Sequence, residues 1–194
     1  KVGAQKALHT EGNRIENCRY GFHFDHCNNL SMKKDLFIEC HGAGIYMDRN
    51  DYNRITESTF LSCNEGIREV DDCHKNLMSF SLFKGCSGPA IHLSPSSYSD
   101  RIYNNAFLLN NGTGDSYIEG RPQVMDEGGK GKWFNPDGTG NHWHDLRGPD
   151  SDSDGRVDVP YDIENNRTDD YPITEMHLQI ASTPTYPGAQ GFKG

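Results

Sequence analysis

The sequence has few apolar residues and no long apolar run. Only 34% of its 194 residues are hydrophobic, and the mean hydropathy is -0.80. No segment approaches the roughly 18 apolar residues that a membrane helix needs, so we expect no membrane insertion. Clusters of positive charge are also missing, because the longest is the pair Lys33-Lys34 and the net charge is -9. The negatively charged chain therefore repels the phosphates of nucleic acid at long range, and we do not expect nucleic acid as a partner.

What the sequence does contain is a repeat of about 23 residues. FIECHGAGI, FLSCNEGI and FKGCSGPAI begin at residues 37, 60 and 83, and each has Cys three residues after Phe. Four columns of residues keep this period: Cys18, Cys40, Cys63 and Cys86, continued by Asn110; Phe37, Phe60, Phe83 and Phe107; Met32, Ile55, Met78 and Ile102; and Phe22, Ile45, Ile67 and Ile91.

The spacing of apolar residues inside each repeat indicates strands. Apolar residues alternate with polar ones, as in Phe22-His23-Phe24, and no period of 3.6 is sustained. Leucine is too sparse for a leucine-rich repeat, and Asn and Gly turns are frequent. We therefore predict an all-β fold, a right-handed parallel β-helix whose coils stack at about 4.8 Å. The predicted domains are coils over residues 1–112, truncated at the N-terminus, a cap over 113–180 and a tail over 181–194.

The cysteine column has two interpretations. Thiols stacked about 4.8 Å apart lie within reach of a disulfide, and paired cysteines suit an exported scaffold. Small buried thiols that replace a stacked Asn are the alternative, which we favour. The sequence leaves open whether Cys18, Cys40, Cys63 and Cys86 are free.

The C-terminal third carries a set of short motifs. They are Gly140-Asn141-His142-Trp143-His144-Asp145, Gly148, the acidic run from Asp150 to Asp158, Val159-Pro160-Tyr161 and Asp170-Tyr171-Pro172. Together with the coils, they resemble the NosD-like right-handed β-helix family, which includes the accessory protein of nitrous oxide reductase and many surface proteins. The resemblance implies copper delivery as one function, with plausible ligands His23, His26, Cys27, His41, His142 and His144, because imidazole and thiolate suit copper.

The acidic run also resembles the first part of a calcium-binding loop. Oxygen ligands at alternate positions, a Gly at the sixth position and a backbone carbonyl at the seventh fit Ca²⁺ better than Mg²⁺, although the bidentate Glu at the twelfth position is absent. The predicted metal residues are Asp150, Asp152, Asp154, Arg156 and Asp158, with a structural role for the ion. A solvated acidic loop is the alternative.

Polar residues follow the inward column on the opposite face of the predicted strands. His23, Tyr46, Arg68 and His92 form one outward column, and this elongated surface is typical of β-helices that bind polysaccharide. A catalytic set there would supply a base, an acid and a carboxylate clamp for a lyase, epimerase or hydrolase. Its candidates are His23, Asp25, His26, Tyr46, Asp48, Arg49 and Arg68, and the carbohydrate-binding candidates are His92, Asp71, Trp133 and Trp143. The two tryptophans are otherwise expected in the apolar body of the cap.

The sequence thus leads to one main functional prediction and two alternatives. The main prediction is an exported protein, extracellular, on the cell surface or periplasmic, that binds an extended acidic polysaccharide along one lateral face. Whether it acts on the glycan stays open. The alternatives are a copper-binding accessory protein and a non-enzymatic surface or filament module that docks to itself or to a larger assembly.

Overall fold

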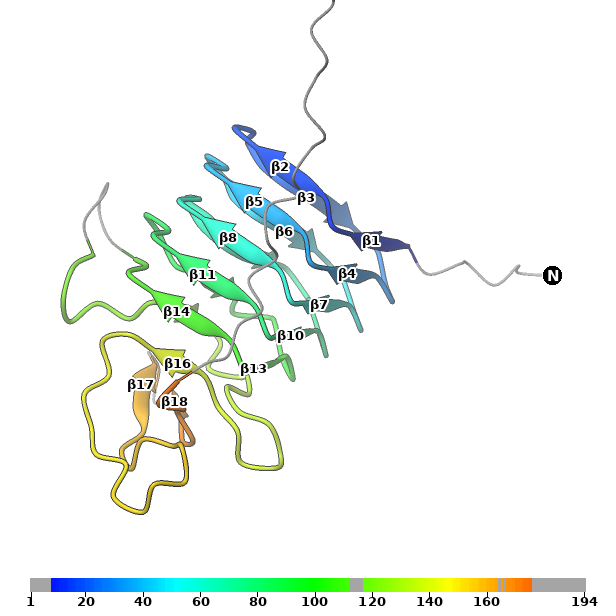
Figure 1. The fold of residues 1–194 in the computed structure, drawn as a ribbon. Coiled ribbons are helices and arrows are strands. Elements are labelled where there is room, and N and C mark those ends of the chain that lie inside the picture. Colours follow the sequence, from blue (N-terminus) through cyan, green and yellow to red (C-terminus); the bar gives the residue numbers. More distant parts are fainter. Residues whose placement is uncertain (1–7, 112–116, 164, 166, 176–194) are drawn as a thin grey trace, which may run out of the picture.

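The protein is a parallel β-solenoid in the computed structural model, which describes residues 8–111, 117–163, 165 and 167–175 (Figure 1). Successive coils lie side by side, and each contributes one strand to each of three parallel sheets. No helix occurs in the described residues, and hence none that spans a membrane. The predicted all-β fold and coil period of about 23 residues are confirmed.

The strands of the three sheets are short and recur in a fixed order along the chain. The first sheet contains β1 (His9–Glu11), β4 (Ser31–Lys33), β7 (Arg54–Thr56), β10 (Leu77–Ser79) and β13 (Arg101–Tyr103). The second contains β2 (Arg14–Glu16), β5 (Leu36–Ile38), β8 (Thr59–Leu61), β11 (Leu82–Lys84), β14 (Ala106–Leu108) and β16 (His142–Trp143). The third contains β3 (Tyr20–Asp25), β6 (Ala43–Asp48), β9 (Glu65–Val70), β12 (Ile91–Leu93) and β15 (Met125–Asp126).

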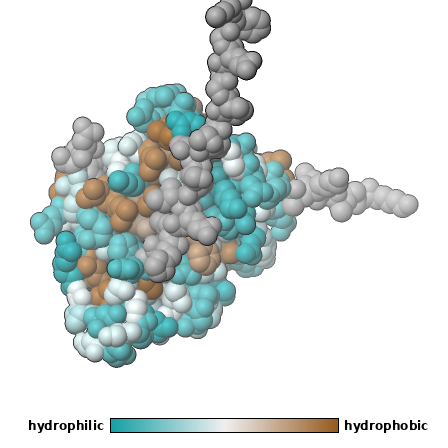
Figure 2. All heavy atoms as spheres, in the orientation of Figure 1, coloured by the Kyte–Doolittle hydropathy of each residue, from teal (hydrophilic) through white to brown (hydrophobic). Residues whose placement is uncertain are grey.

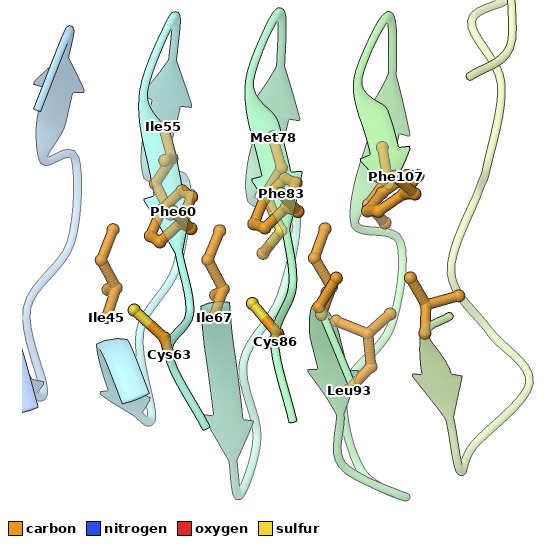
Figure 3. Close-up of a cluster of buried hydrophobic side chains, with 14 of the residues drawn as sticks. Ile45, Ile55, Phe60, Cys63, Ile67, Met78, Phe83, Cys86, Leu93 and Phe107 are labelled. Atoms are coloured by element: carbon orange, nitrogen blue, oxygen red, sulfur yellow. The ribbon is translucent and has the colours of Figure 1, made fainter. Parts of the chain in front are cut away.

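The core consists of in-register stacks of identical or similar side chains (Figure 3). The rings of Phe37, Phe60, Phe83 and Phe107 are fully buried, with neighbouring centroids 4.6 to 5.2 Å apart. The columns begun by Met32 and Phe22 are paired in the same way. Each coil thus buries its few apolar residues against the coils beside it, and a chain of low hydropathy still builds one continuous core.

Close packing of the phenylalanine stack depends on small residues in the third sheet. A Cβ atom at Gly66 would lie 2.6 Å from the Phe83 ring and 2.5 Å from the Ala90 carbonyl oxygen. Gly44 meets the Phe60 ring in the same way, at 2.6 Å. These glycines are therefore needed for the close approach of ring and backbone and not for an unusual φ angle.

A ladder of buried polar side chains runs along one corner of the solenoid. Each member accepts a hydrogen bond from a backbone N–H one coil earlier, at 2.7 to 3.2 Å. The accepting residues are Asp35, Ser58, Ser81, Asn105, Asn141 and Asp169. The ladder satisfies backbone donors that the corner would otherwise leave buried and unpaired. Its last rung belongs to the C-terminal segment, so the ladder joins that segment to the coils.

The C-terminal segment continues the stack before it becomes irregular. β15 pairs with β12 and β16 pairs with β14, so both sheets extend past the predicted domain boundary at residue 112. The two remaining strands, β17 (Tyr161–Ile163) and β18 (Arg167–Asp169), form an antiparallel pair. The predicted tail, 181–194, lies outside the described residues.

Candidate metal and ligand sites

The predicted lateral face exists with the predicted register. His23 pairs with Tyr46, Tyr46 with Arg68, and Arg68 with His92 along the third sheet. Asp25 likewise pairs with Asp48. The register of this column is as predicted, although His92 is only 8% exposed. A ligand-binding role for these side chains, and binding of polysaccharide along this face, stay predictions.

At the C-terminal end of this face, the charged side chains form ion pairs with one another. Glu65 Oε1 lies 2.8 Å from Arg68 Nη1 and 3.1 Å from His92 Nδ1, and His92 Nε2 lies 3.2 Å from Glu127 Oε1. Burial lowers the pKa of His92, but the hydrogen bonds and charges of Glu65 and Glu127 outweigh it and raise the pKa above its ordinary value. His92 thus lies between two carboxylates that favour its protonated form.

At the N-terminal end, a second charged group surrounds Arg49. Its Nη2 lies 3.0 Å from Asp48 Oδ2 and 3.4 Å from Asp25 Oδ1, and Asp25 also contacts His26 Nδ1. These contacts, first the hydrogen bond from His26, lower the pKa of Asp25. Asp25 is therefore kept ionised and is not poised as a general acid. Asp71 is exposed one coil beyond Arg49.

Tyr46 lies between two aromatic rings. Its ring centroid is 4.7 Å from that of Tyr20 and 4.8 Å from that of His23. Burial raises the pKa of the Tyr46 hydroxyl, so it keeps its proton at neutral pH. The cluster offers ring faces and the hydroxyls of two tyrosines at the surface of the first two coils.

The histidine and cysteine ligands implied for copper are not gathered at one place. His142 Nδ1 contacts the Ile173 carbonyl oxygen, while His144 Nδ1 accepts from Leu109 N at 3.3 Å and contacts Gln123 at 3.2 Å. Burial lowers the pKa of His144. His23, His26, Cys27 and His41 belong to the first two coils, at the other end of the solenoid.

A different pair of soft ligands does come together. The Sγ atoms of Cys18 and Cys40 lie 3.5 Å apart, and both cysteines are free. Cys18 is half-buried in the first coil, whereas Cys40 is fully buried beneath it. Burial, together with the contact to Cys40, raises the pKa of Cys18 to about 11. The cysteine column was predicted from the sequence, but this pair was not singled out as a site.

The acidic loop brings three of its predicted metal residues together. One carboxylate oxygen from each of Asp150, Asp152 and Asp154 lies within 4.8 Å of the others, and no second group of three His, Cys, Asp or Glu ligands occurs among the described residues. Asp158 instead accepts a hydrogen bond from Ser151 N at 2.8 Å, and the Arg156 guanidinium lies 3.7 Å from Asp154. Calcium binding by this loop stays a prediction.

Trp133 and Trp143 are part of the core and do not present a sugar-stacking surface. They are 1% and 2% exposed. The Trp143 ring is stacked between Phe107 at 4.4 Å and Tyr161 at 3.9 Å, and its Nε1 donates to Asp169 at 3.0 Å. The expectation of direct carbohydrate stacking at these two residues is therefore corrected, and the apolar role that we also expected for them is the one observed.

The surface holds a further feature that the sequence analysis missed. Figure 2 shows brown apolar patches separated by teal polar ones on the viewed face, and no single large apolar surface. On the first sheet, two cavities are lined by the cations Arg54, Lys75, Arg101, Lys132 and Arg167. Arg54 and Arg101 share one column of the repeat but are separated there by Leu77, and the other three cations come from other columns or from the C-terminal segment. The sequence therefore showed no continuous run of positive charge.

Comparison with protein-family models finds a match. The family model described as periplasmic copper-binding protein (NosD) matches residues 2–148, which is more than half of the chain. The chain belongs to the NosD family. The match covers the coils and ends just before the acidic loop. No curated protein matches the chain individually.

Membership of the NosD family confirms the resemblance seen in the sequence. It supports the copper-binding alternative more than the main prediction of polysaccharide binding. A NosD protein is described as periplasmic, which agrees with one of the predicted locations, and as copper-binding, which was an alternative and not the main prediction. Cell-surface or extracellular location, and polysaccharide as the ligand, gain no support from the match.

Proposed function

We propose that this chain is a periplasmic copper-binding accessory protein in which Cys18 and Cys40 hold copper as cargo. The 3.5 Å contact between their two sulfur atoms carries this proposal, in a chain whose family is described as copper-binding. Thiolate sulfur is a soft ligand that selects Cu(I), whereas carboxylates suit harder cations. The acidic loop is therefore the less suitable of the two sites for copper.

The position of the two thiols fits the loading and release of an ion. Cys18 is partly exposed in the first coil, so solvent and a donor protein can reach it, and Cys40 lies directly behind it with no exposed surface. Neither sulfur is committed to a disulfide. A two-thiol site at the edge of a rigid stack needs no rearrangement of the core to accept or release its ion.

The thiols are protonated when no metal is bound, and this makes binding depend on pH. Burial raises the pKa of Cys18 to about 11, and the pKa of Cys40 is raised further, with a hydrogen bond to Cys63 as the main cause and burial next. Copper must displace these protons, so its affinity increases as pH rises below these values. If both protons leave, the increase is as much as about a hundredfold per pH unit.

Titration with Cu(I) in competition with a chromogenic chelator, under anaerobic conditions, tests the site. We expect one equivalent bound by the wild type and none bound tightly by Cys18→Ser/Cys40→Ser. The matched control is Cys73→Ser/Cys86→Ser, which removes two buried thiols that are not at the pair. Retention of copper by Cys18→Ser/Cys40→Ser would refute the assignment.

Two further measurements separate this site from its competitors. His142→Ala/His144→Ala is expected to keep its copper, and a loss would move the site to the C-terminal segment. A thiol count on protein isolated from the periplasm is expected to find Cys18 and Cys40 reduced or metal-bound. A disulfide between them in the copper-loaded protein would contradict the proposal.

A further inference from the structure

Two adjoining cavities form a groove along the outer side of the first sheet. In Figure 1 the strands of this sheet beside the groove carry the labels β7, β10 and β13. Their volumes are about 410 and 520 Å³, and Arg101 and Lys132 line both of them. We call their combined lining the basic groove. Its lining also includes Arg54, Lys75, Tyr103, Phe134, Arg167 and Asp170.

The charge of the basic groove is opposite to that of the chain as a whole. The chain has a net charge of -9, yet the groove contains five cationic side chains and one carboxylate, Asp170. Among the described residues, none of these five cations forms an ion pair, although most other lysines and arginines on the coils do. Lys75 donates to the Tyr52 hydroxyl and Arg167 to the Gly129 carbonyl oxygen, so neither charge is neutralised by these contacts. Five cations beside a single carboxylate favour an anionic ligand.

The register of the first sheet arranges the cations in a row. Arg54 pairs with Leu77 and Leu77 with Arg101, and Arg101 forms a β-bridge with Lys132. Because neighbouring strands are about 4.8 Å apart, Arg54 and Arg101 are separated by about 10 Å and Lys132 lies one step further. A row of this kind matches an extended ligand with repeated negative charges better than a single compact anion.

The groove also offers apolar and aromatic surface beside the charges. Tyr103 and Phe134 are half-buried in its lining, and the Phe134 ring packs edge-on against Tyr171 with centroids 5.0 Å apart. Aromatic side chains provide flat apolar surface on which a ring of a ligand packs. Arginine forks bind carboxylates in a bidentate manner, so the two elements together suit a chain of ring units that carry carboxylates.

We propose that the basic groove binds an extended acidic oligosaccharide whose carboxylates contact Arg101 and Lys132. The site is on a different sheet from the His23 face and at the opposite end from Cys18, so it stands independently of copper binding. A nucleic acid fits less well, because the rest of the molecule repels a dense polyphosphate and the family is described as periplasmic.

Calorimetric titration of the full chain with a uronic acid hexamer tests the proposal. We expect saturable binding that weakens at high salt, and no binding of a neutral glucose hexamer. Arg101→Gln/Lys132→Gln is expected to weaken binding by at least about tenfold, because two charge-assisted contacts are lost. Circular dichroism spectra that match the wild type would show that the variant is folded.

A control variant tests the location of the site, and a competing ligand tests the identity of the ligand. Lys84→Gln/Lys130→Gln removes the same charge from exposed positions outside the basic groove and is expected to stay within about twofold of the wild type. An equal loss in this control would overturn the site. Failure of the wild type to bind the uronate, or tighter binding of a single-stranded oligonucleotide, would overturn the assignment of the ligand.

Discussion

The coils and the C-terminal segment reach stability by different means. In the coils, the large apolar side chains of the core stack on similar side chains of the next coil, as in the phenylalanine stack. In the segment after residue 117, unlike rings pack on one another: Trp143 lies between Phe107 and Tyr161, and its indole is bonded to Asp169. Stacking of repeated residues builds a core from few apolar side chains. One cluster of unlike aromatic rings around Trp143 then covers the C-terminal end of that core.

The largest contrast between the two regions is expected from truncation of an aromatic ring. Phe60→Ala removes a fully buried ring from the middle of the stack and is expected to lower the free energy of unfolding by about 3 to 5 kcal/mol. Phe134→Ala removes a half-buried ring of the C-terminal segment, and about 1 kcal/mol is expected. Urea unfolding measures both, and a Phe134→Ala cost equal to that of Phe60→Ala would contradict the comparison.

The second largest loss of stability is expected from a substitution in the polar ladder, which joins the two regions. Asn105 Nδ2 donates to the carbonyl oxygens of Met78 and Tyr103, and its Oδ1 accepts from Ser81 N. Asn105→Ala leaves these buried groups unpaired and is expected to cost about 2 to 3 kcal/mol. Asn64→Ala at an exposed turn is the matched control, with a change within about 0.5 kcal/mol expected. Equal costs, measured by urea unfolding, would show that the ladder does not contribute.

Two buried carboxyl groups inside the last coils are expected to make the stability of the fold depend on pH. Glu69 and Asp100 are 1% and 0% exposed, and each has one carboxylate oxygen without a hydrogen-bond partner in the described structure. Burial raises the pKa of both groups, and their mutual repulsion raises that of Asp100 further. The pair is therefore most favourable when it carries a proton.

The consequence is a dependence of stability on pH, which a substitution of Asp100 reduces by removing one of the two groups. The folded state binds more protons than the unfolded state, so this contribution is fully present below about pH 4 and is lost as pH rises above it. Asp100→Asn cannot ionise and is expected to be about 1 to 2 kcal/mol more stable than the wild type at pH 8. Melting curves between pH 4 and 9 test this, and parallel profiles for the two proteins would refute it.

The smallest expected effect concerns the acidic loop. If Asp150, Asp152 and Asp154 bind Ca²⁺, calcium at ten times its dissociation constant stabilises the fold by about 1.4 kcal/mol. Asp152→Asn is expected to abolish this response, and Mg²⁺ is expected to produce less of it because it requires stricter geometry. Thermal unfolding with added calcium provides the measurement. An unchanged melting temperature would leave the loop as a solvated acidic turn.

Sequence reasoning succeeded where the chain repeats itself. The columns of Phe37 and Phe22 have one period and one residue type or size, so their stacking and the outward position of His23 followed directly. The polar ladder was missed because its residue type changes between Asp, Ser and Asn, and because Asn141 and Asp169 depart from the period.

The sites were less predictable than the fold because they depend on side-chain packing. The burial of Trp143 depends on Tyr161, whose contact no spacing rule indicates. Likewise, Arg54 and Arg101 are separated by Leu77 in the register, so the basic groove shows no continuous run of charge in the sequence. The contact between Cys18 and Cys40 follows from the column, but its chemistry depends on the unequal exposure of the two thiols.

X-ray absorption at the copper edge, on protein loaded with one equivalent of Cu(I), tests the central claim most directly. The account predicts a first shell of sulfur alone in the wild type, which disappears in Cys18→Ser/Cys40→Ser and persists in Cys73→Ser/Cys86→Ser. A first shell of nitrogen or oxygen in the wild type would show that Cys18 and Cys40 do not hold the metal.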